Sequence, residues 1–318
     1  MKRRSLGRTG LRVSEIAFGG VEIGIPYGIG VRDKNDMLGR TEAIRLLHGA
    51  LDKGINLFDT ARLYGESESI MGEAFKDRRD QVVFATKCAH FLDASGAIPP
   101  YDSLKKIILS SLEESLRALQ TDYVDIYMLH QSDHGILEDE GVRQVFAELK
   151  ESGRIRAAGT SVYHLEETAY AVNEGGWDVI QLPFNLMDQR QGAIFEKAAA
   201  MGVGLIVRSV LLKGLLSDRG SRLHPALKDV EAHIAKYQAL LGAQFRDLPT
   251  LATKFALSFP EVSSVLVGID REEYLSKTLL AADGTYLDEK QLSLALSLHY
   301  PDPAFLDLPK WDRMGWLT

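Results

Sequence analysis

Cysteine is nearly missing from this chain, with Cys88 alone among 318 residues. One cysteine cannot form an internal disulfide, which excludes the small secreted folds that disulfides hold together. Its neighbours Lys87 and His90 could activate the thiol as a nucleophile, but a small residue that fills space beside a strand is the interpretation we prefer. Cys88 is therefore expected to be structural.

An excess of basic charge is missing as well. The formal net charge is −7, and the longest basic run is Lys2-Arg3-Arg4. A protein that binds nucleic acid needs a basic surface to neutralise phosphates. Nucleic acid is therefore not an expected partner.

Long hydrophobic runs do not occur. No apolar stretch approaches the roughly 18 to 20 residues of a membrane-spanning helix, and the basic start leads into Gly7-Arg8-Thr9-Gly10 rather than into the apolar core of a signal peptide. We expect no membrane partner and, by default, a cytoplasmic location.

The chain does contain a regular alternation of β-rich runs and helical patterns, within an ordinary globular composition of 45% hydrophobic and 25% charged residues. Glycine follows several of the helical segments, just before the next β-rich run, where it can take the left-handed conformation that ends a helix. The eight β-rich runs span residues 15–20, 56–60, 82–87, 123–130, 155–161, 179–184, 204–209 and 264–269.

Eight βα units with strands that are apolar on both faces predict parallel strands covered by helices. Their number and the chain length predict an α/β fold of the (β/α)8 TIM-barrel type, as a single domain over residues 1–318. Residues 217–245 then form a helical insertion after strand seven. The tail from Tyr300 onward, with Trp311 and Trp316, could cover the pocket or pack on the barrel, and the sequence favours neither.

Ionisable residues stand where successive predicted strands end. Asp59, Lys87 and His130 close the runs that begin at residues 56, 82 and 123, and Tyr64 follows Asp59 closely. Barrel enzymes carry their catalytic groups at this end of the strands. A nearby ammonium favours the phenolate of a tyrosine, and a carboxylate can hold that ammonium in place.

These four residues suit one reaction. His130 could donate a hydrogen bond to a carbonyl oxygen while Tyr64 protonates that oxygen as a hydride arrives. Singly, each residue has a plainer interpretation, such as a helix cap for Asp59 or a surface charge for Lys87. Jointly, they predict carbonyl reduction or its reverse.

Several motifs in order resemble the aldo-keto reductase family across nearly the whole barrel. They are Leu6-Gly7-Arg8-Thr9-Gly10-Leu11-Arg12-Val13-Ser14, Gly54-Ile55-Asn56-Leu57-Phe58-Asp59-Thr60-Ala61, Tyr64-Gly65, Thr86-Lys87, Leu129-His130 and Gly153-Arg154-Ile155-Arg156. The resemblance places the catalytic tetrad of the family on Asp59, Tyr64, Lys87 and His130. It implies NAD(P)(H)-dependent reduction of an aldehyde or ketone.

The resemblance also implies a cofactor that lies across the barrel mouth without a Rossmann fold, and no Gly-x-Gly-x-x-Gly fingerprint follows any predicted strand. It places nicotinamide contacts on Ser161 and Gln181. It places pyrophosphate contacts on the 209–215 loop. The cofactor positions expected in full are Gly20, Val21, Asp59, Ser161, Gln181, Arg208, Ser209, Val210, Leu211, Lys213, Gly214, Gly268, Asp270, Arg271, Tyr274 and Thr278.

This chain departs from the family pattern around the cofactor. Val162 replaces an asparagine, and Arg208 replaces the aromatic residue that stacks on the nicotinamide. The Arg208 guanidinium could lie flat under that ring or reach a phosphate. Asp270 would repel the 2′-phosphate of NADP(H), whereas Arg271 would attract it. The choice between NADP(H) and NAD(H) therefore stays open.

Two other functions compete with catalysis of carbonyl reduction. The chain could be a regulatory or binding subunit that holds the cofactor with little turnover, which the intact tetrad argues against. It could also be a metal-dependent hydrolase using His130, Asp133 and His134, although the spacing does not complete a ligand set and we expect no metal. Polar and glycine-rich rim loops favour a small sugar-like or hydroxylated carbonyl substrate. The sequence does not indicate the oligomeric state.

Overall fold

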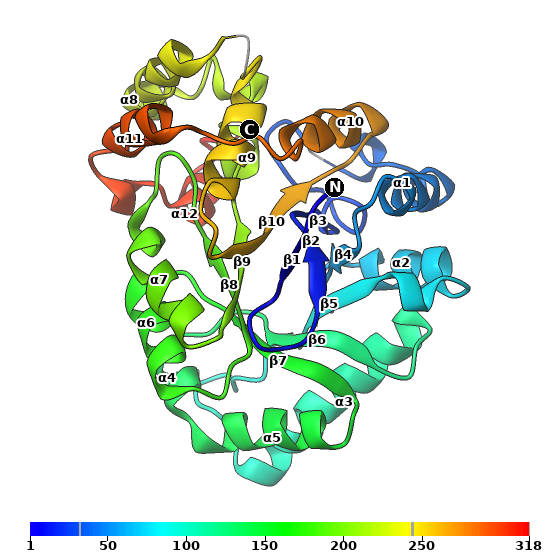
Figure 1. The fold of residues 1–318 in the computed structure, drawn as a ribbon. Coiled ribbons are helices and arrows are strands. Elements are labelled where there is room, and N and C mark those ends of the chain that lie inside the picture. The colour runs from blue at the N-terminus through cyan, green and yellow to red at the C-terminus, as the bar shows by residue number, and fades with distance from the viewer. Residues whose placement is uncertain (32, 243–244, 318) are drawn as a thin grey trace.

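The protein forms a closed barrel of eight parallel strands with helices on its outside (Figure 1), in a computed structural model that describes residues 1–31, 33–242 and 245–317. The strands pair in the order β10-β3-β4-β5-β6-β7-β8-β9 and then back to β10. This confirms the predicted (β/α)8 fold. The strands are β3 (Ile16–Gly19), β4 (Leu57–Asp59), β5 (Val83–Lys87), β6 (Val124–Leu129), β7 (Ile155–Ser161), β8 (Val179–Pro183), β9 (Gly204–Arg208) and β10 (Val262–Gly268).

A helix follows each barrel strand and covers its outer face (Figure 1). Gly54, Gly153 and Gly202 take positive φ values of 101°, 74° and 72° just after three of these helices, as the sequence predicts. The covering helices are α1 (Arg40–Asp52), α2 (Ser67–Phe75), α3 (Tyr101–Leu119), α5 (Glu140–Glu151), α6 (Leu165–Glu174), α7 (Phe195–Ala200), α9 (Leu248–Leu257) and α10 (Glu272–Ala281).

The strands are buried on both faces, because alternate residues point in opposite directions. In β6, Ile126 and Met128 belong to the cluster that fills the barrel, whereas Tyr127 and Leu129 belong to the layer between strands and helices. This period of two holds each strand end in a fixed orientation. Residues at the carboxyl ends therefore converge on one mouth.

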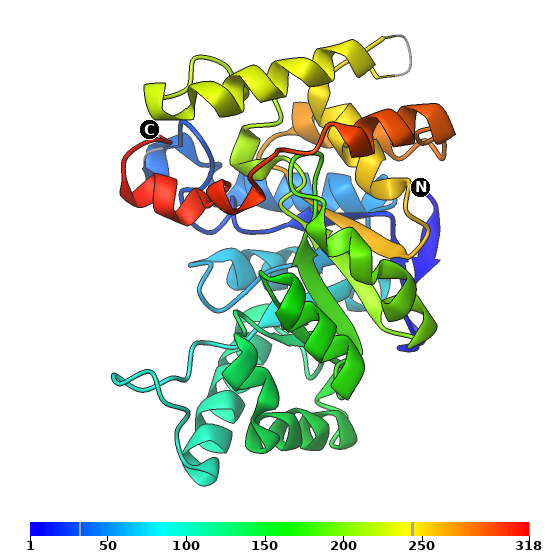
Figure 2. The same ribbon diagram turned by 90° about the vertical axis from the view of Figure 1, so that its left-hand side faces the viewer.

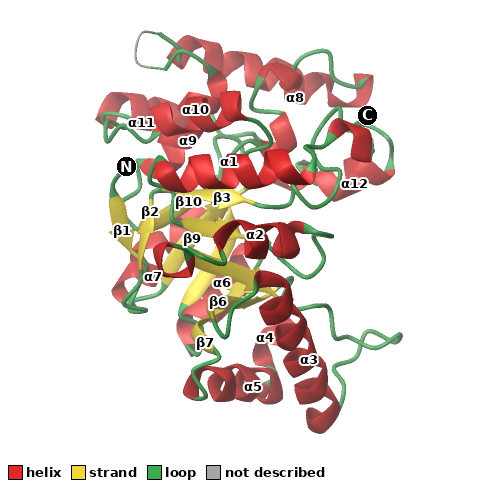
Figure 3. Cartoon of the chain, turned by 90° about the vertical axis from the view of Figure 1, so that its right-hand side faces the viewer, coloured by secondary structure: helices red, strands yellow, loops and turns green. Residues whose placement is uncertain are grey.

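A short antiparallel hairpin of β1 (Arg3–Ser5) and β2 (Arg12–Ser14) closes the other end of the barrel. Leu6, Leu11 and Val13 from this hairpin join the interior cluster. Figure 3 shows the hairpin and helix α12 (Leu308–Arg313) at opposite ends of the molecule. The hairpin is absent from our sequence predictions.

The described part of the insertion, residues 217–242, and the C-terminal tail pack against each other over the barrel (Figure 2). Trp316 stacks on His224 with ring centroids 5.8 Å apart, and Tyr300 meets His233 edge to face with centroids 5.1 Å apart. The tail thus packs on the insertion. The remaining helices of the described residues lie in these two segments and in the loops between the barrel elements. They are α4 (His134–Glu138), α8 (Lys228–Ile234), α11 (Glu289–Ser297) and the 3-10 helices η1 (Lys34–Asp36), η2 (Arg79–Gln81), η3 (Arg190–Ile194), η4 (Leu212–Gly214), η5 (Asp218–Gly220), η6 (Pro225–Leu227), η7 (Ala235–Leu240) and η8 (Pro303–Phe305).

Among the described helices, none has both the length and the apolarity needed to cross a bilayer. The loop before α3 projects from the catalytic end of the barrel, and Figure 2 shows it in cyan on the left. Residues 89–92 of this loop line the cavity described below.

Candidate active site

The parallel barrel brings the four predicted catalytic side chains to one mouth. Asp59 is the last residue of β4, Lys87 is the last residue of β5, and His130 directly follows β6. Tyr64 lies in the loop between β4 and α2. Neighbouring strand ends therefore supply all four groups, at the end of the barrel where such folds carry their chemistry.

Lys87 and Asp59 form a buried ion pair. The Lys87 Nζ lies 2.8 and 2.6 Å from the two Asp59 oxygens and 3.0 Å from the Thr60 carbonyl. The two residues are only 1% and 2% exposed. Burial lowers the pKa of Lys87, and the Asp59 carboxylate opposes that shift. Gln181 Nε2 also donates to Asp59 Oδ1 at 2.8 Å, so the carboxylate is held from two sides.

Tyr64 lies over this pair. The Lys87 Nζ is 5.0 Å from the centre of the Tyr64 ring, and the Tyr64 and His130 rings meet edge to face with centroids 5.4 Å apart. We expected the ammonium to favour the phenolate, but in the protein without ligand its effect is outweighed, because the pKa of Tyr64 is raised overall. Burial raises the pKa of Tyr64 above its ordinary value, Asp59 raises it further, and Arg208 lowers it. Tyr64 therefore carries its proton at neutral pH.

His130 is neutral at physiological pH. Burial, with added repulsion from Lys87, His90 and Arg208, lowers the pKa of His130 to about 3. His90 stacks on it with ring centroids 5.6 Å apart and an interplanar angle of 22°. The buried Nδ1 of His130 has no hydrogen-bond partner among the described residues. A neutral imidazole can still donate one hydrogen bond, as the proposed chemistry requires.

The low pKa of His130 predicts a pH-dependent loss of stability. Between the ordinary value of 6.5 and about 3, the unfolded chain gains a proton that the folded chain does not. Lowering the pH from 7 to 5 should therefore reduce the free energy of unfolding by about 2 kcal/mol through this group. Urea unfolding of the wild type and of His130→Asn at both pH values measures this contribution, with the exposed His299→Asn as control. If His130→Asn loses as much stability as the wild type, the buried neutral state is refuted.

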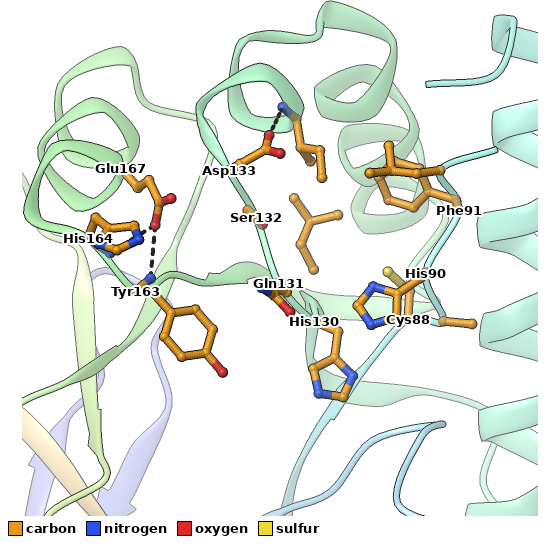
Figure 4. A pocket seen from close by; sticks show the side chains of 14 residues that line it. Cys88, His90, Phe91, His130, Gln131, Ser132, Asp133, Tyr163, His164 and Glu167 are labelled. Carbon is orange, nitrogen blue, oxygen red and sulfur yellow. Dashed lines mark hydrogen bonds between the residues drawn. The ribbon is translucent and has the colours of Figure 1, made fainter. Parts of the chain in front are cut away.

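A cavity of about 320 Å³ opens beside His130 (Figure 4). Its wall carries aromatic rings from His90, His130 and Tyr163 together with several polar groups. Asp133 and Glu167 accept from backbone N–H groups at the starts of α4 and α6, which fixes the two loops that line the cavity. The tail contributes no lining residue in the part of the chain described. The cavity is lined by Cys88, Ala89, His90, Phe91, Leu92, Leu129, His130, Gln131, Ser132, Asp133, Ile136, Tyr163, His164 and Glu167.

The loop after β9 has the backbone of an anion site. Ser209, Leu212, Lys213 and Gly214 have positive φ values of 60°, 47°, 56° and 105°, whereas Leu211 between them has a negative φ of −99°. Such alternation turns successive N–H groups toward one point. Within the described ranges, the N–H groups of Val210 and Leu211 have no acceptor. This loop therefore fits the pyrophosphate of a dinucleotide.

Lys213 is already engaged at the end of this loop. Its Nζ lies 3.1 Å from Asp312 Oδ2 of the tail and 5.0 Å from the centre of the Tyr27 ring. The tail thus reaches the predicted pyrophosphate loop although it does not line the cavity. A bound phosphate would have to share the Lys213 ammonium with Asp312.

The predicted adenosine end gathers around the start of α10. Asp270 and Arg271 pair at 3.4 Å, and the Arg271 guanidinium lies 5.1 Å from the centre of the Tyr274 ring. Gly268 is exposed at the end of β10, and Thr278 is buried further along α10. These positions form one region at the mouth, next to β3.

Glu22 lies in this region, and our sequence analysis missed it. Its carboxyl group occupies the space that a Cβ at Gly268 would need, and its Oε2 is buried without a hydrogen-bond partner among the described residues. Burial raises the pKa of Glu22 to about 8, and the carboxylates of Asp270 and Asp59 add to the shift. No local pattern indicates this residue, because its neighbours come from distant strands.

Ser161 ends β7 and lies beside Gln181 of β8, since the two residues are paired in the register of the strands. Both are buried, and the nicotinamide contacts expected of them stay a prediction. Gly20 is different: Ser67 and Met71 already fill the space beside its Cα, and its N–H donates to the Asp59 carbonyl. Gly20 therefore holds β3 against β4, and only the neighbouring Val21 is partly exposed.

Arg208 is engaged within the protein at the end of β9. Its guanidinium stacks on the ring of Tyr163 at 4.1 Å from the ring centre. Two hydrogen bonds hold it there, from Nη2 to the Val162 carbonyl at 2.9 Å and from Nη1 to Ser209 Oγ at 3.1 Å. The ring on which Arg208 stacks thus belongs to the protein itself.

The profile of the Aldo/keto reductase family matches residues 15–298. The L-galactose dehydrogenase of Arabidopsis thaliana is 29% identical over 307 residues, which cover 91% of this chain and 92% of that protein. A probable voltage-gated potassium channel subunit beta of Oryza sativa is 29% identical over 317 residues, with coverage of 89% and 92%. An aldo-keto reductase of Bacillus halodurans, solved in its holo form, superposes with a TM-score of 0.77 at 27% identity over 94% of this chain and 96% of that one.

These similarities extend over nearly the whole barrel and include both sequence and structure. They agree with the arrangement of strand-end residues at the mouth. The chain therefore belongs to the aldo/keto reductase family, whose members use nicotinamide nucleotide cofactors, and it is an oxidoreductase.

Proposed function

We propose that this protein reduces the carbonyl group of an aldehyde or ketone, or oxidises the corresponding alcohol, at the site formed by Asp59, Tyr64, Lys87 and His130. The observation that carries the proposal is the buried Lys87–Asp59 pair beneath the Tyr64 ring, beside a neutral His130. A bound nicotinamide dinucleotide supplies the hydride. The residues of the chain bind the carbonyl oxygen and move the proton.

The carbonyl oxygen would lie between the Tyr64 hydroxyl and the His130 imidazole. Tyr64 donates its proton to that oxygen as the hydride reaches the carbonyl carbon, so the product is an alcohol. The high pKa of Tyr64 keeps the proton available, and the Lys87 ammonium stabilises the phenolate that remains until solvent reprotonates it. Asp59 holds Lys87 in position. His130 donates a hydrogen bond and does not ionise.

We assign the nicotinamide carboxamide to Ser161 and Gln181 and the pyrophosphate to the loop of Ser209, Val210, Leu211, Lys213 and Gly214. The Gln181 amide donates to Asp59, which holds this side chain beside the catalytic cluster and supports the assignment. The unused N–H groups of Val210 and Leu211 support the pyrophosphate assignment. Val21, Gly268, Asp270, Arg271, Tyr274 and Thr278 are assigned to the remainder of the dinucleotide.

We propose NAD(H) rather than NADP(H) as the cofactor. The Asp270 carboxylate lies at the adenosine end, where it would repel a 2′-phosphate, and Arg271 is already paired with Asp270. Replacing Asp270 with serine should leave NADH binding within about twofold and tighten NADPH binding by about tenfold, because one repelling charge at close range is removed. Fluorescence titration of tryptophan with each dinucleotide measures both constants. Tighter binding of NADPH than of NADH by the wild type would contradict the assignment.

The substrate that suits the cavity is a small hydroxylated carbonyl. Several polar groups face it, among them His90, Gln131, Ser132 and His164. The name of the Arabidopsis relative, L-galactose dehydrogenase, supports a sugar-like substrate. We place the protein in the cytoplasm on the sequence grounds already given.

Steady-state assays with NADH and NADPH test the proposed function. Glyceraldehyde is the hydroxylated substrate, and benzaldehyde is the apolar control. We expect carbonyl-dependent oxidation of at least one cofactor, with a higher kcat/KM for glyceraldehyde. Tight dinucleotide binding without reduction of any carbonyl would instead favour a regulatory or binding subunit; the Oryza relative is named as a probable potassium channel subunit.

A further inference from the structure

Arg208 carries a positive charge at the barrel mouth that no carboxylate neutralises. Among the described residues, no Asp or Glu oxygen lies within 4.0 Å of its guanidinium, whereas most other arginines near the barrel ends are paired in that way. The guanidinium is half-buried at the end of β9. Its position is fixed by the Tyr163 ring and by hydrogen bonds to Val162 and Ser209.

This charge acts on the reacting groups from the opposite side of the mouth. It contributes to lowering the pKa of Tyr64, of Lys87 and of His130, which come from three different strand ends. Arg208 is thus within electrostatic reach of all three residues. The point where a carbonyl oxygen would meet Tyr64 and His130 lies within the same reach.

The nicotinamide ring must come close to that point, since hydride transfer needs the reacting atoms about 3 to 3.5 Å apart. The oxidised ring carries a positive charge and the reduced ring is neutral. A fixed cation nearby repels the charged oxidised ring and has little electrostatic effect on the neutral reduced ring. We propose that Arg208 makes this site distinguish the two redox states, so that it binds the reduced dinucleotide more tightly than the oxidised one.

This inference rests on the proposed function and adds a specific task for one residue. The adenosine and phosphate groups are the same in both redox states, so contacts with them cancel in the ratio of the two dissociation constants. That ratio therefore reports on the surroundings of the nicotinamide ring. Tyr163 is the positioning residue, because its ring and the neighbouring carbonyl keep the guanidinium from turning toward solvent.

The test is titration of the wild type, Arg208→Gln and Arg208→Lys with NADH and NAD⁺, and with the phosphorylated pair. Removing the charge should lower the ratio of the oxidised to the reduced dissociation constant by about tenfold, as expected for two unit charges several ångströms apart in a partly buried site. Arg208→Lys keeps the charge and should keep the ratio within about threefold. Arg154→Gln, at the other end of the barrel, is the matched control and should leave both constants unchanged.

An Arg208→Gln variant that weakens both redox forms equally would overturn the inference and show a purely structural role. If that variant does not fold, Arg208→Met removes the same charge while its apolar side chain can still pack on the Tyr163 ring, and an unchanged ratio in Arg208→Met would likewise overturn the inference. Failure of the wild type to bind any of the four dinucleotides would overturn the proposed function as well. If the wild type binds dinucleotide but Arg208→Gln has the same ratio of oxidised to reduced dissociation constants, only the role of Arg208 is overturned.

Discussion

Replacing Tyr64 with phenylalanine should lower kcat for carbonyl reduction by about a thousandfold or more, because it removes the group that donates the proton. The change deletes one oxygen and keeps the ring that lies over Lys87 and against His130. Binding of the dinucleotide should therefore stay within about twofold. Steady-state kinetics together with fluorescence titration measure the two effects separately.

Tyr101→Phe is the matched control for this variant. The Tyr101 hydroxyl donates to Glu148 on the outer helices and lies away from the cluster at the mouth. Its loss should leave kcat unchanged. Retention of more than about a tenth of the wild-type kcat by Tyr64→Phe would show that another group or solvent supplies the proton, since general acids contribute about a hundredfold or more.

Replacing Lys87 with methionine should destabilise the protein by about 3 to 5 kcal/mol and abolish catalysis, because the Asp59 carboxylate would be left buried with its main partner removed. Both residues are almost fully buried, and the Gln181 amide is a neutral donor that replaces only part of the interaction. Urea unfolding measures the loss of stability. The activity assay on folded protein measures the loss of function.

The double variant Lys87→Met with Asp59→Asn separates these two consequences. Neutralising the orphaned carboxylate should restore at least about half of the lost stability, whereas catalysis should stay absent. A double variant no more stable than Lys87→Met alone would mean that packing, rather than the buried charge, accounts for the loss. Recovery of activity by the double variant would exclude the ion pair from catalysis.

The sequence was sufficient to predict the barrel and the cluster at its mouth, because both follow from regular local patterns. Each predicted strand run contains the observed strand or overlaps it, and parallel strands bring their carboxyl ends together. Asp59, Lys87 and His130 end such runs, so their proximity could be predicted without coordinates. Tyr64 follows Asp59 too closely in sequence to lie elsewhere.

The hairpin at the base of the barrel could not be predicted in the same way. Its strands β1 and β2 have three residues each, too short to show an alternating pattern, and β1 is largely exposed. Helix α4 is five residues long and is set by the Asp133 cap rather than by an apolar stripe. Short elements of this kind depend on tertiary contacts for their stability.

The errors and omissions at the site have a common cause: burial and contacts between distant segments cannot be predicted from local sequence patterns. The pKa of Tyr64 is raised because burial and the Asp59 carboxylate outweigh the lowering effect of the Arg208 cation. Glu22 rests on Gly268 from the other end of the chain. Arg208 at the end of β9 stacks on Tyr163, which follows β7, and no local sequence pattern indicates that contact.

The central claim is that the cluster at the mouth transfers hydride from a bound nicotinamide to a carbonyl. A single-turnover experiment tests it most directly: wild-type protein is loaded with one equivalent of NADH or NADPH and mixed with glyceraldehyde, while the absorbance of the reduced nicotinamide is followed. We predict that the bound cofactor is oxidised completely and that alcohol forms in equal amount. No binding of either dinucleotide up to about a millimolar, the upper end of usual Michaelis constants, or binding with no oxidation by any carbonyl would contradict the claim.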